Sequence, residues 1–227
     1  MDNASEFAQI AMELAERPDV EETVASITAF ARRALACQYA GIHLVKGRRI
    51  VTAAATDPII EKADQLQNDV GEGPCLSAIW NQGIYVVHDT STDERWPRFA
   101  PLAAEMGLHS ILSVRLHAAG DEMGALNLYA HDVREFTADD VAEATIFGQH
   151  ASVALAAARR EENLAAAIDA RHLIGQAQGI LMERFDLSAD QAFSVLRRYS
   201  QAHNVKLRLV AQRLIETRRL PAERRHP

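Results

Sequence analysis

Few cysteines, few aromatic residues and no long apolar run set the first limits on this chain of 227 residues. Two cysteines are too few for a secreted disulfide framework. Glycine (11) and proline (7) are sparse beside 48% hydrophobic and 24% charged residues, which excludes a wholly disordered or collagen-like chain. No apolar run approaches the roughly 18 residues of a membrane span, and the first residues lack the basic and apolar segments of a signal peptide. We therefore expect a cytoplasmic protein without a membrane partner.

Charge is distributed unevenly along the chain. The net charge is −7, but residues 1–163 hold 13 basic and 25 acidic residues, whereas residues 164–227 hold 11 basic and 6 acidic residues. An acidic body followed by a basic tail indicates two functions on one chain. The basic tail is either a polyanion-binding module, because Lys and Arg release counterions from phosphates, or an arginine-rich solvated helical surface.

The body alternates between helical and strand periodicity. Apolar spacing predicts helices over 2–16 and 19–36, and the strands that follow are close enough in sequence for antiparallel pairing. Helices between the strands would cover the sheet, so the pattern predicts an α+β fold. The expected strands are 39–45, 49–55, 84–88, 110–116 and 124–130, and the expected intervening helices are 58–67, 75–81 and 97–106.

A long helix and two shorter ones are predicted after the sheet. No proline occurs between Thr137 and Phe185, and Thr137 with Asp140 has capping-box spacing, so one helix of about 45 residues is expected. Such a length implies self-association or a bridge between domains. A weak heptad register allows a dimeric coiled coil, with Val153, Arg160, Ala167, Ile174 and Leu181 at a and Ala157, Leu164, Arg171 and Gln178 at d.

The rest of the tail has clear helix boundaries. Ser188 and Gln191 have the spacing of a second capping box, Asn204 is the expected stop, and a last helix is predicted over 206–218. The tail is therefore expected to be an all-α domain of three helices.

The tail carries a motif, RHLIGQAQGILMER over 171–184, which continues through Ser188, the pair Arg197-Arg198 and Asn204 to Ala211. This pattern resembles the ANTAR domain of bacterial transcription antiterminators. The resemblance implies a homodimer that binds paired hexaloop stem-loops in nascent RNA and thereby blocks an overlapping terminator hairpin. It predicts these RNA-facing positions: Arg171, Gln176, Gln178, Gly179, Arg184, Arg197, Arg198, Tyr199, Ser200, Asn204, Lys206 and Arg208.

Some of these positions have structural alternatives. Tyr199 falls on the apolar arc of its helix, Gly179 is suited to close helix packing, and Asn204 is equally suited to a helix cap. Gln178 stands where the family usually has lysine, so one cation is missing from the pattern.

The body, over residues 20–158, resembles a GAF domain. Five segments carry the resemblance, and it implies a sensory domain with a small-molecule pocket and a role in signal transduction. We divide the chain into a GAF-like domain, 1–158, and an ANTAR-like domain, 159–227. The candidate ligand-binding residues are His88, Asp89, Trp96 and Arg98. The segments of the resemblance are AGIHL (40–44), GEGPC (71–75), VVHD (86–89), SILSV (110–114) and GALNLY (124–129).

Other functions fit the sequence less well. No metal motif, catalytic triad or paired-carboxylate signature is present, no cofactor can be named, and we expect no enzyme activity. Cys75 follows the Gly-Glu-Gly-Pro loop and is either a buried structural cysteine or a redox-active one. Cys37 and Cys75 do not match the cysteine set of a free-methionine sulfoxide reductase. The alternative to an RNA-binding antiterminator is a GAF-regulated DNA-binding transcriptional regulator.

Overall fold

The computed structural model describes residues 19–47, 49–118 and 121–219, so the helix expected over 2–16 lies outside the described residues. The chain divides into two compact units, Met1–Glu161 and Glu162–Pro227, which are described separately.

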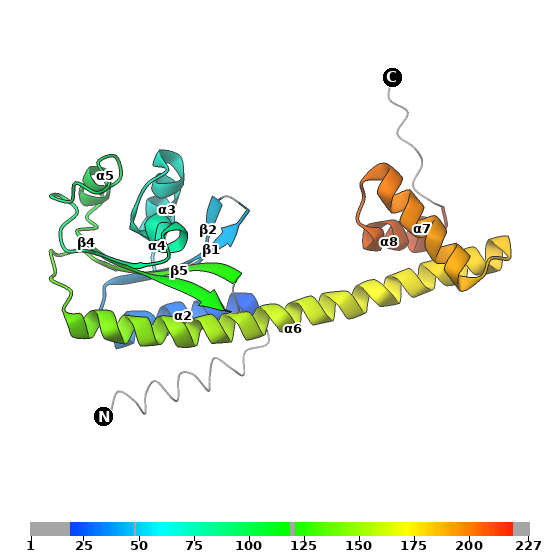
Figure 1. The fold of residues 1–227 in the computed structure, drawn as a ribbon, viewed down its shortest axis with the longest axis horizontal. Helices are drawn as coiled ribbons and strands as arrows, with labels where there is room; N and C mark the ends of the chain where they lie inside the picture. The colour runs from blue at the N-terminus through cyan, green and yellow to red at the C-terminus, as the bar shows by residue number, and fades with distance from the viewer. Residues whose placement is uncertain (1–18, 48, 119–120, 220–227) are drawn as a thin grey trace, which may run out of the picture. The chain divides into compact units, whose positions relative to one another are not determined.

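The first unit is built on a five-stranded antiparallel sheet (Figure 1). The strand order is β2-β1-β5-β4-β3, and every neighbouring pair is antiparallel, which confirms the predicted α+β class. Strands β4 and β5 extend beyond the expected 110–116 and 124–130, into the residues that join them. The strands are β1 (Tyr39–Lys46), β2 (Arg49–Ala55), β3 (Ile84–Val87), β4 (Ser110–Ala118) and β5 (Asp121–Ala130).

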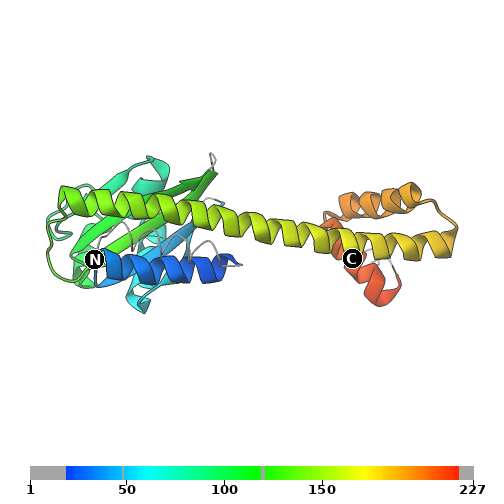
Figure 2. The same ribbon diagram turned by 90° about the horizontal axis from the view of Figure 1, so that it is seen from below.

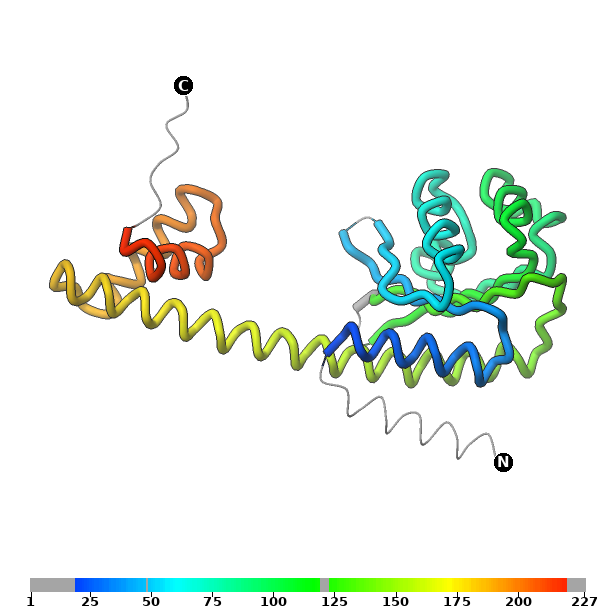
Figure 3. Tube along the Cα trace, turned by 180° about the vertical axis from the view of Figure 1, so that it is seen from behind, coloured from blue at the N-terminus to red at the C-terminus, as the bar shows by residue number. Residues whose placement is uncertain are grey.

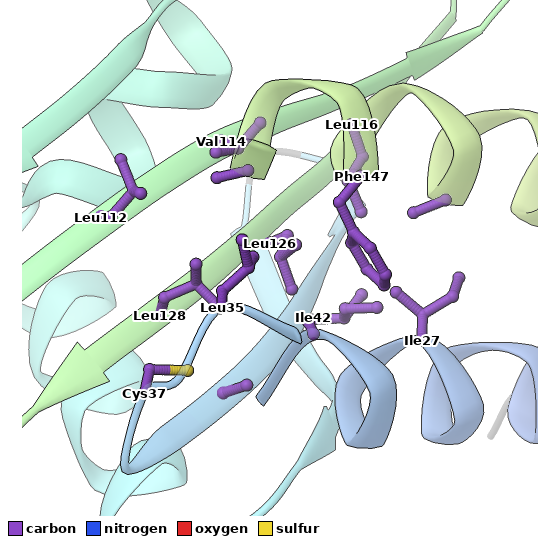
Figure 4. Close-up of a cluster of buried hydrophobic side chains, with 14 of the residues drawn as sticks. Ile27, Leu35, Cys37, Ile42, Leu112, Val114, Leu116, Leu126, Leu128 and Phe147 are labelled. Carbon is purple, nitrogen blue, oxygen red and sulfur yellow. The ribbon is translucent and has the colours of Figure 1, made fainter. Parts of the chain in front are cut away.

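One face of the sheet packs on two helices, α2 (Val20–Ala34) and the first part of α6 (Ala138–Phe185), which run side by side (Figures 2 and 3). Alternate strand residues point into this layer, as Leu126 and Leu128 do beside Leu35 (Figure 4), and they share one core with Ile27 and Phe147. Each fully buried side chain of this size contributes about 1.5–3 kcal/mol, so this layer is the main apolar core of the unit.

The opposite face of the sheet is covered by α3 (Pro58–Val70) and α4 (Pro74–Trp80), with α5 (Ala100–Glu105) beyond them. Helix α5 is shorter than the predicted 97–106. Side chains on this face include Ile111 and Tyr129, which pack with Ile60 and Phe99. The two faces therefore hold different cores, as the period-two alternation of the strands requires.

The loop between α3 and α4 contains two glycines with separate roles. Gly71 ends α3 in the left-handed conformation (φ 71°), and its N–H donates to the carbonyl of Gln67 at 2.9 Å. Gly73 (φ 144°) lies so close to the Gln67 side chain that a Cβ there would overlap the amide oxygen Oε1. The loop therefore depends on glycine both for its backbone angles and for space.

Gly73→Ala is accordingly expected to destabilise the first unit. The backbone angle alone costs about 1–3 kcal/mol for a residue with a Cβ, and the overlap with Gln67 adds to it. Urea unfolding followed by tryptophan fluorescence measures the change, because both tryptophans, Trp80 and Trp96, lie in this unit. A loss below about 0.5 kcal/mol, the range of an ordinary surface substitution, would show that the loop has another accessible conformation.

Helix α6 is a single helix of 48 residues, close to the expected length. Its capping box is present, because the Asp140 N–H donates to the Thr137 hydroxyl at 3.1 Å and the Thr137 N–H donates to the Asp140 carboxylate at 2.8 Å. Among the helices that the structure describes, none is long and apolar enough to span a membrane.

The second unit packs the end of α6 against α7 (Ala189–His203) and α8 (Leu207–Thr217), which confirms the predicted helical tail. Ser188 and Gln191 form the predicted capping box, and Asn204 ends α7 in the left-handed conformation (φ 50°). The buried core of this unit is aliphatic and comprises Ala177, Leu181, Ala192, Leu196, Val210, Ala211 and Leu214.

This core corrects the heptad register in its second half. Leu181, at an a position, is 1% exposed inside the core, and Ile174, also at a, packs against it. Leu181 is therefore occupied within the unit, whereas Ile174 is only partly buried. Val153 and Leu164 remain exposed on α6, by 68% and 64%.

Candidate nucleic-acid interface

Eight of the twelve residues predicted to face RNA have exposed polar side chains, and two of these eight, Arg184 and Asn204, also have structural roles within the second unit. Arg197 and Arg198 are neighbours on α7, and Lys206 is the N-cap residue of α8. Guanidinium groups donate to phosphates through a planar fork and stack on bases, and side-chain amides bind base edges. These side chains have the chemistry that an RNA surface requires. The other six exposed residues are Arg171, Gln176, Arg197, Arg198, Lys206 and Arg208.

Three other predicted positions are engaged within the unit. Gln178 Nε2 donates to the carbonyl of Ala189 at 3.0 Å and so connects α6 to the start of α7. The Ser200 hydroxyl donates to the carbonyl of Val205 at 2.6 Å across the turn between α7 and α8. Arg184 donates to the carbonyl of Arg218 at 2.5 Å, where α8 ends. These three side chains stabilise the arrangement of the helices.

Tyr199 and Asn204 also have local roles. The Tyr199 ring is half-buried against the aliphatic core and is stacked on His203, with 4.0 Å between the ring centroids. Asn204 occupies the left-handed position that ends α7, which asparagine tolerates better than most residues.

An open groove of about 460 Å³ brings three of the predicted positions together. Gln176, Gly179 and Arg184 lie along α6, and the other side is lined by Ile215 of α8 and by Arg218, the residue that caps α8. Gly179 is exposed, and a Cβ built on it would meet no atom within 4 Å. Among the described residues, no other helix therefore packs closely against Gly179.

The four candidate ligand residues of the first unit have separate partners. His88 is exposed and accepts the N–H of Phe136, and Asp89 accepts the N–H and hydroxyl of Ser91, which lower the pKa of its carboxyl. Trp96 is buried and donates to the Ser77 hydroxyl at 3.0 Å. Arg98 is exposed and pairs with Glu72.

A buried polar cluster in the first unit was only partly predicted. The sequence marks Cys75 as either structural or redox-active, and the structure places its sulfur beside His43, which in turn contacts Asp64. The three residues come from β1, α3 and α4. One signal in the sequence could have indicated this cluster: His43 lies amid the apolar residues of the strand segment YAGIHLVK.

Comparison with known families assigns both units. The GAF domain profile matches residues 18–156, and the ANTAR domain profile matches residues 162–215. The chain belongs to the GAF domain family and carries an ANTAR domain. An ANTAR domain implies RNA binding and antitermination, and a GAF domain is a sensor domain, so this GAF–ANTAR protein has a regulatory architecture with RNA as the partner of its tail.

Solved structures show the GAF fold. The GAF domain of a phosphoenolpyruvate-protein phosphotransferase from Coxiella burnetii is 16% identical, with a TM-score of 0.57 over 72% of this chain and 98% of that chain. The corresponding domain from Acinetobacter is 16% identical, with a TM-score of 0.56 over 70% and 97%. A free methionine-R-sulfoxide reductase from Neisseria meningitidis is 22% identical, with a TM-score of 0.56 over 68% and 88%. No curated protein matches the GAF–ANTAR chain significantly.

Proposed function

We propose that the GAF–ANTAR chain is a dimeric antiterminator that binds two stem-loops in a nascent transcript through its ANTAR domain. The observation that carries the proposal is the exposed set Arg171, Gln176, Arg197, Arg198, Lys206 and Arg208 on the three helices of that domain. RNA loops offer unstacked bases and clustered phosphates, which suit arginine forks and glutamine amides. Occupied stem-loops cannot form an overlapping terminator hairpin, so transcription continues.

The dimer would form along α6. Ile146, Val153, Leu164 and Ile168 are 47–68% exposed, and at 100° per residue they fall within an arc of about 60° on the helix. Exposed apolar side chains aligned on one face of a helix favour burial against a partner. Two ANTAR domains in one dimer match two stem-loops in one transcript.

Regulation would pass from the GAF domain to the tail through the same helix. Phe147 and Leu155 of α6 are buried in the core of the GAF domain, and Ala177 and Leu181 of α6 are buried in the core of the ANTAR domain. A change in the packing of the GAF core therefore acts on a helix that also builds the RNA-binding domain.

A transcription assay tests the proposal. A template is built whose leader carries two hexaloop stem-loops, the second overlapping a terminator. Adding the full chain is expected to increase the fraction of transcripts that read through the terminator, and scrambling the loop sequences is expected to abolish the increase. Unchanged read-through would contradict antitermination. Repression of initiation through binding to promoter DNA would also contradict it and would support the DNA-binding alternative.

Gly179 provides a more specific prediction. Glycine in the interior of a helix costs about 0.5–1 kcal/mol relative to alanine, and nothing within the chain occupies the space above Gly179. We therefore expect Gly179→Ala to stabilise the ANTAR domain by this amount while weakening RNA binding at least threefold, because the RNA backbone approaches the helix at this point.

Gly175→Ala is the matched control, because Gly175 lies one turn earlier on α6 and a Cβ there also meets no atom within 4 Å. It is expected to stabilise the domain without weakening RNA binding. Equal RNA affinities of the two variants would show that Gly179 does not contact RNA. Thermal unfolding and fluorescence anisotropy measure the two effects.

A further inference from the structure

A thiol, an imidazole and a carboxylate lie in line inside the GAF domain, between the sheet and the helices α3 and α4. The Cys75 sulfur is 3.0 Å from Nδ1 of His43, and Nε2 of His43 is 2.7 Å from the Asp64 carboxylate. The Thr52 hydroxyl donates to the same carboxylate oxygen. Cys75 and His43 are fully buried, and Asp64 is 2% exposed.

This arrangement equips His43 to act as a base toward the Cys75 thiol. Burial opposes a positive charge on the imidazole, but the Asp64 carboxylate and the Cys75 sulfur beside it raise the pKa of His43 to about 10. A proton that leaves the sulfur is thus accepted at Nδ1, while Asp64 holds the other edge of the ring. Since the thiol and the carboxylate contact opposite edges of the imidazole, the three groups do not converge on one point, and the described residues contain no cluster suited to a metal ion.

Buried polar groups without partners occur on residues that neighbour this cluster. Gln67 Oε1 accepts the Cys75 N–H at 3.0 Å, but its Nε2 has no hydrogen-bond partner among the described residues. The Tyr129 hydroxyl is also buried without a hydrogen-bond partner among the described residues, and this burial, together with the charges of Asp64 and Cys75, raises the pKa of the phenol. The Ser113 hydroxyl, on the strand next to Asn127, is a third such group.

Buried polar groups in native proteins nearly always have partners, so three orphaned groups in one place indicate a small polar molecule that completes their hydrogen bonds. Asn127 adds an amide 2.8 Å from Nδ1 of His43. These groups surround a nucleophile that has its own base.

We propose that Cys75 is an oxidation site of the GAF domain, at which a small hydroperoxide converts the thiol to a sulfenic acid. His43 accepts the thiol proton, and the sulfur attacks one oxygen of the peroxide. The O–O bond breaks, the transferred oxygen becomes the sulfenic acid, and the departing oxygen takes the proton from His43. One thiol and one hydrogen peroxide thus give one sulfenic acid and one water. The Tyr129 hydroxyl and the Gln67 amide hold the peroxide oxygens.

Cys37 is a control within the same molecule. It is buried in the core on the opposite face of the sheet, and desolvation raises the pKa of its thiol to about 11 (Figure 4). Its sulfur contacts the carbonyl of Arg32 at 3.9 Å, which is no base for the thiol. Cys37 is 7% exposed and Cys75 is 0% exposed, so accessibility alone would make Cys37 the more reactive of the two.

The test treats the full chain with hydrogen peroxide at pH 7 for increasing times and removes the peroxide with catalase. The chain is then unfolded in a denaturant that contains a cyclic 1,3-diketone, which traps sulfenic acid, and the two cysteine peptides are quantified by mass spectrometry. We expect Cys75 to be oxidised at least tenfold faster than Cys37. Equal rates, faster reaction of Cys37, or no oxidation of Cys75 would overturn the proposal and leave Cys75 as a structural cysteine.

The role of His43 as a positioned base has its own readout. His43→Gln is expected to lower the oxidation rate of Cys75 at least tenfold, whereas His117→Gln, a change at an exposed histidine of β4, leaves it unchanged. An undiminished rate of Cys75 oxidation in His43→Gln overturns the role of His43 as the base.

If His43→Gln does not fold, the pH dependence of the two oxidation rates in the unmodified chain tests the same role. The rate of Cys37 is expected to rise about tenfold per pH unit between pH 6 and 8, because its thiol stays largely protonated there, and the rate of Cys75 to rise less. Parallel slopes overturn the proposal.

Discussion

The double variant Arg197→Ala/Arg198→Ala is expected to weaken binding of the GAF–ANTAR chain to a tandem hexaloop RNA at least tenfold at fixed salt. Both side chains are exposed on α7, and removing an arginine that pairs with a phosphate reduces the release of counterions. Because two such arginines are removed, the negative slope of the log of the RNA association constant against log salt should become shallower by about 1.4. A tenfold loss of affinity corresponds to about 1.4 kcal/mol, whereas surface changes of this kind alter folding stability by about 0.5 kcal/mol or less. Fluorescence anisotropy over a salt series measures the affinity and the slope.

Arg32→Ala/Arg33→Ala is the matched control for this variant. It removes the same charge from two adjacent exposed arginines, but from the last turn of α2 in the GAF domain. RNA affinity is expected to stay within about twofold of the unmodified chain. Equal losses of affinity in both double variants would show that net charge, rather than the α7 surface, determines RNA binding.

Leu196→Ala is expected to have the largest effect on stability. Leu196 is fully buried in the small aliphatic core of the ANTAR domain, and truncating a buried leucine costs about 2–5 kcal/mol. A domain of this size has roughly 3–8 kcal/mol of stability in total, so the variant should leave much of the tail unfolded and lose RNA binding. The GAF domain should be unaffected because it has its own cores.

Hydrogen exchange with mass spectrometry measures this effect, since both tryptophans lie in the GAF domain and fluorescence does not report on the tail. Peptides from 162–219 are expected to lose protection, while peptides from 39–130 keep it. Leu209→Ala, at a 43% exposed leucine of α8, is the control and should change little. Uniform loss of protection in both domains would contradict the division into two cores.

Local signals predicted much of the fold. Ser188 and Asn204 mark the ends of α7 because a capping hydroxyl and a left-handed asparagine act on backbone atoms close in sequence. The alternation of strand residues predicted the sheet, but it could not show that β4 and β5 continue past residues 116 and 124 toward each other. That boundary depends on pairing between the strands, as for His117 with Glu122.

The candidate sites were harder to predict because their partners are distant in sequence. Gln178 and Arg184 resemble RNA-binding residues in the motif, but they contact carbonyls 11 and 34 residues away, which only the packing of α7 and α8 brings near. For the same reason, the heptad spacing did not indicate that Leu181 is buried in the core of its own unit. Likewise, nothing in the spacing of His43, Asp64 and Cys75 indicates that they meet, since they lie on three different elements.

One titration tests the central claim most directly. The full chain is titrated at a stated salt concentration against a tandem hexaloop RNA, the same RNA with scrambled loops, and a duplex DNA of equal length. Loop-specific recognition predicts that the chain binds the hexaloop RNA at least tenfold more tightly than either competitor. Equal affinity for all three nucleic acids, or preference for the duplex DNA, would contradict the assignment of this protein as an RNA-binding antiterminator.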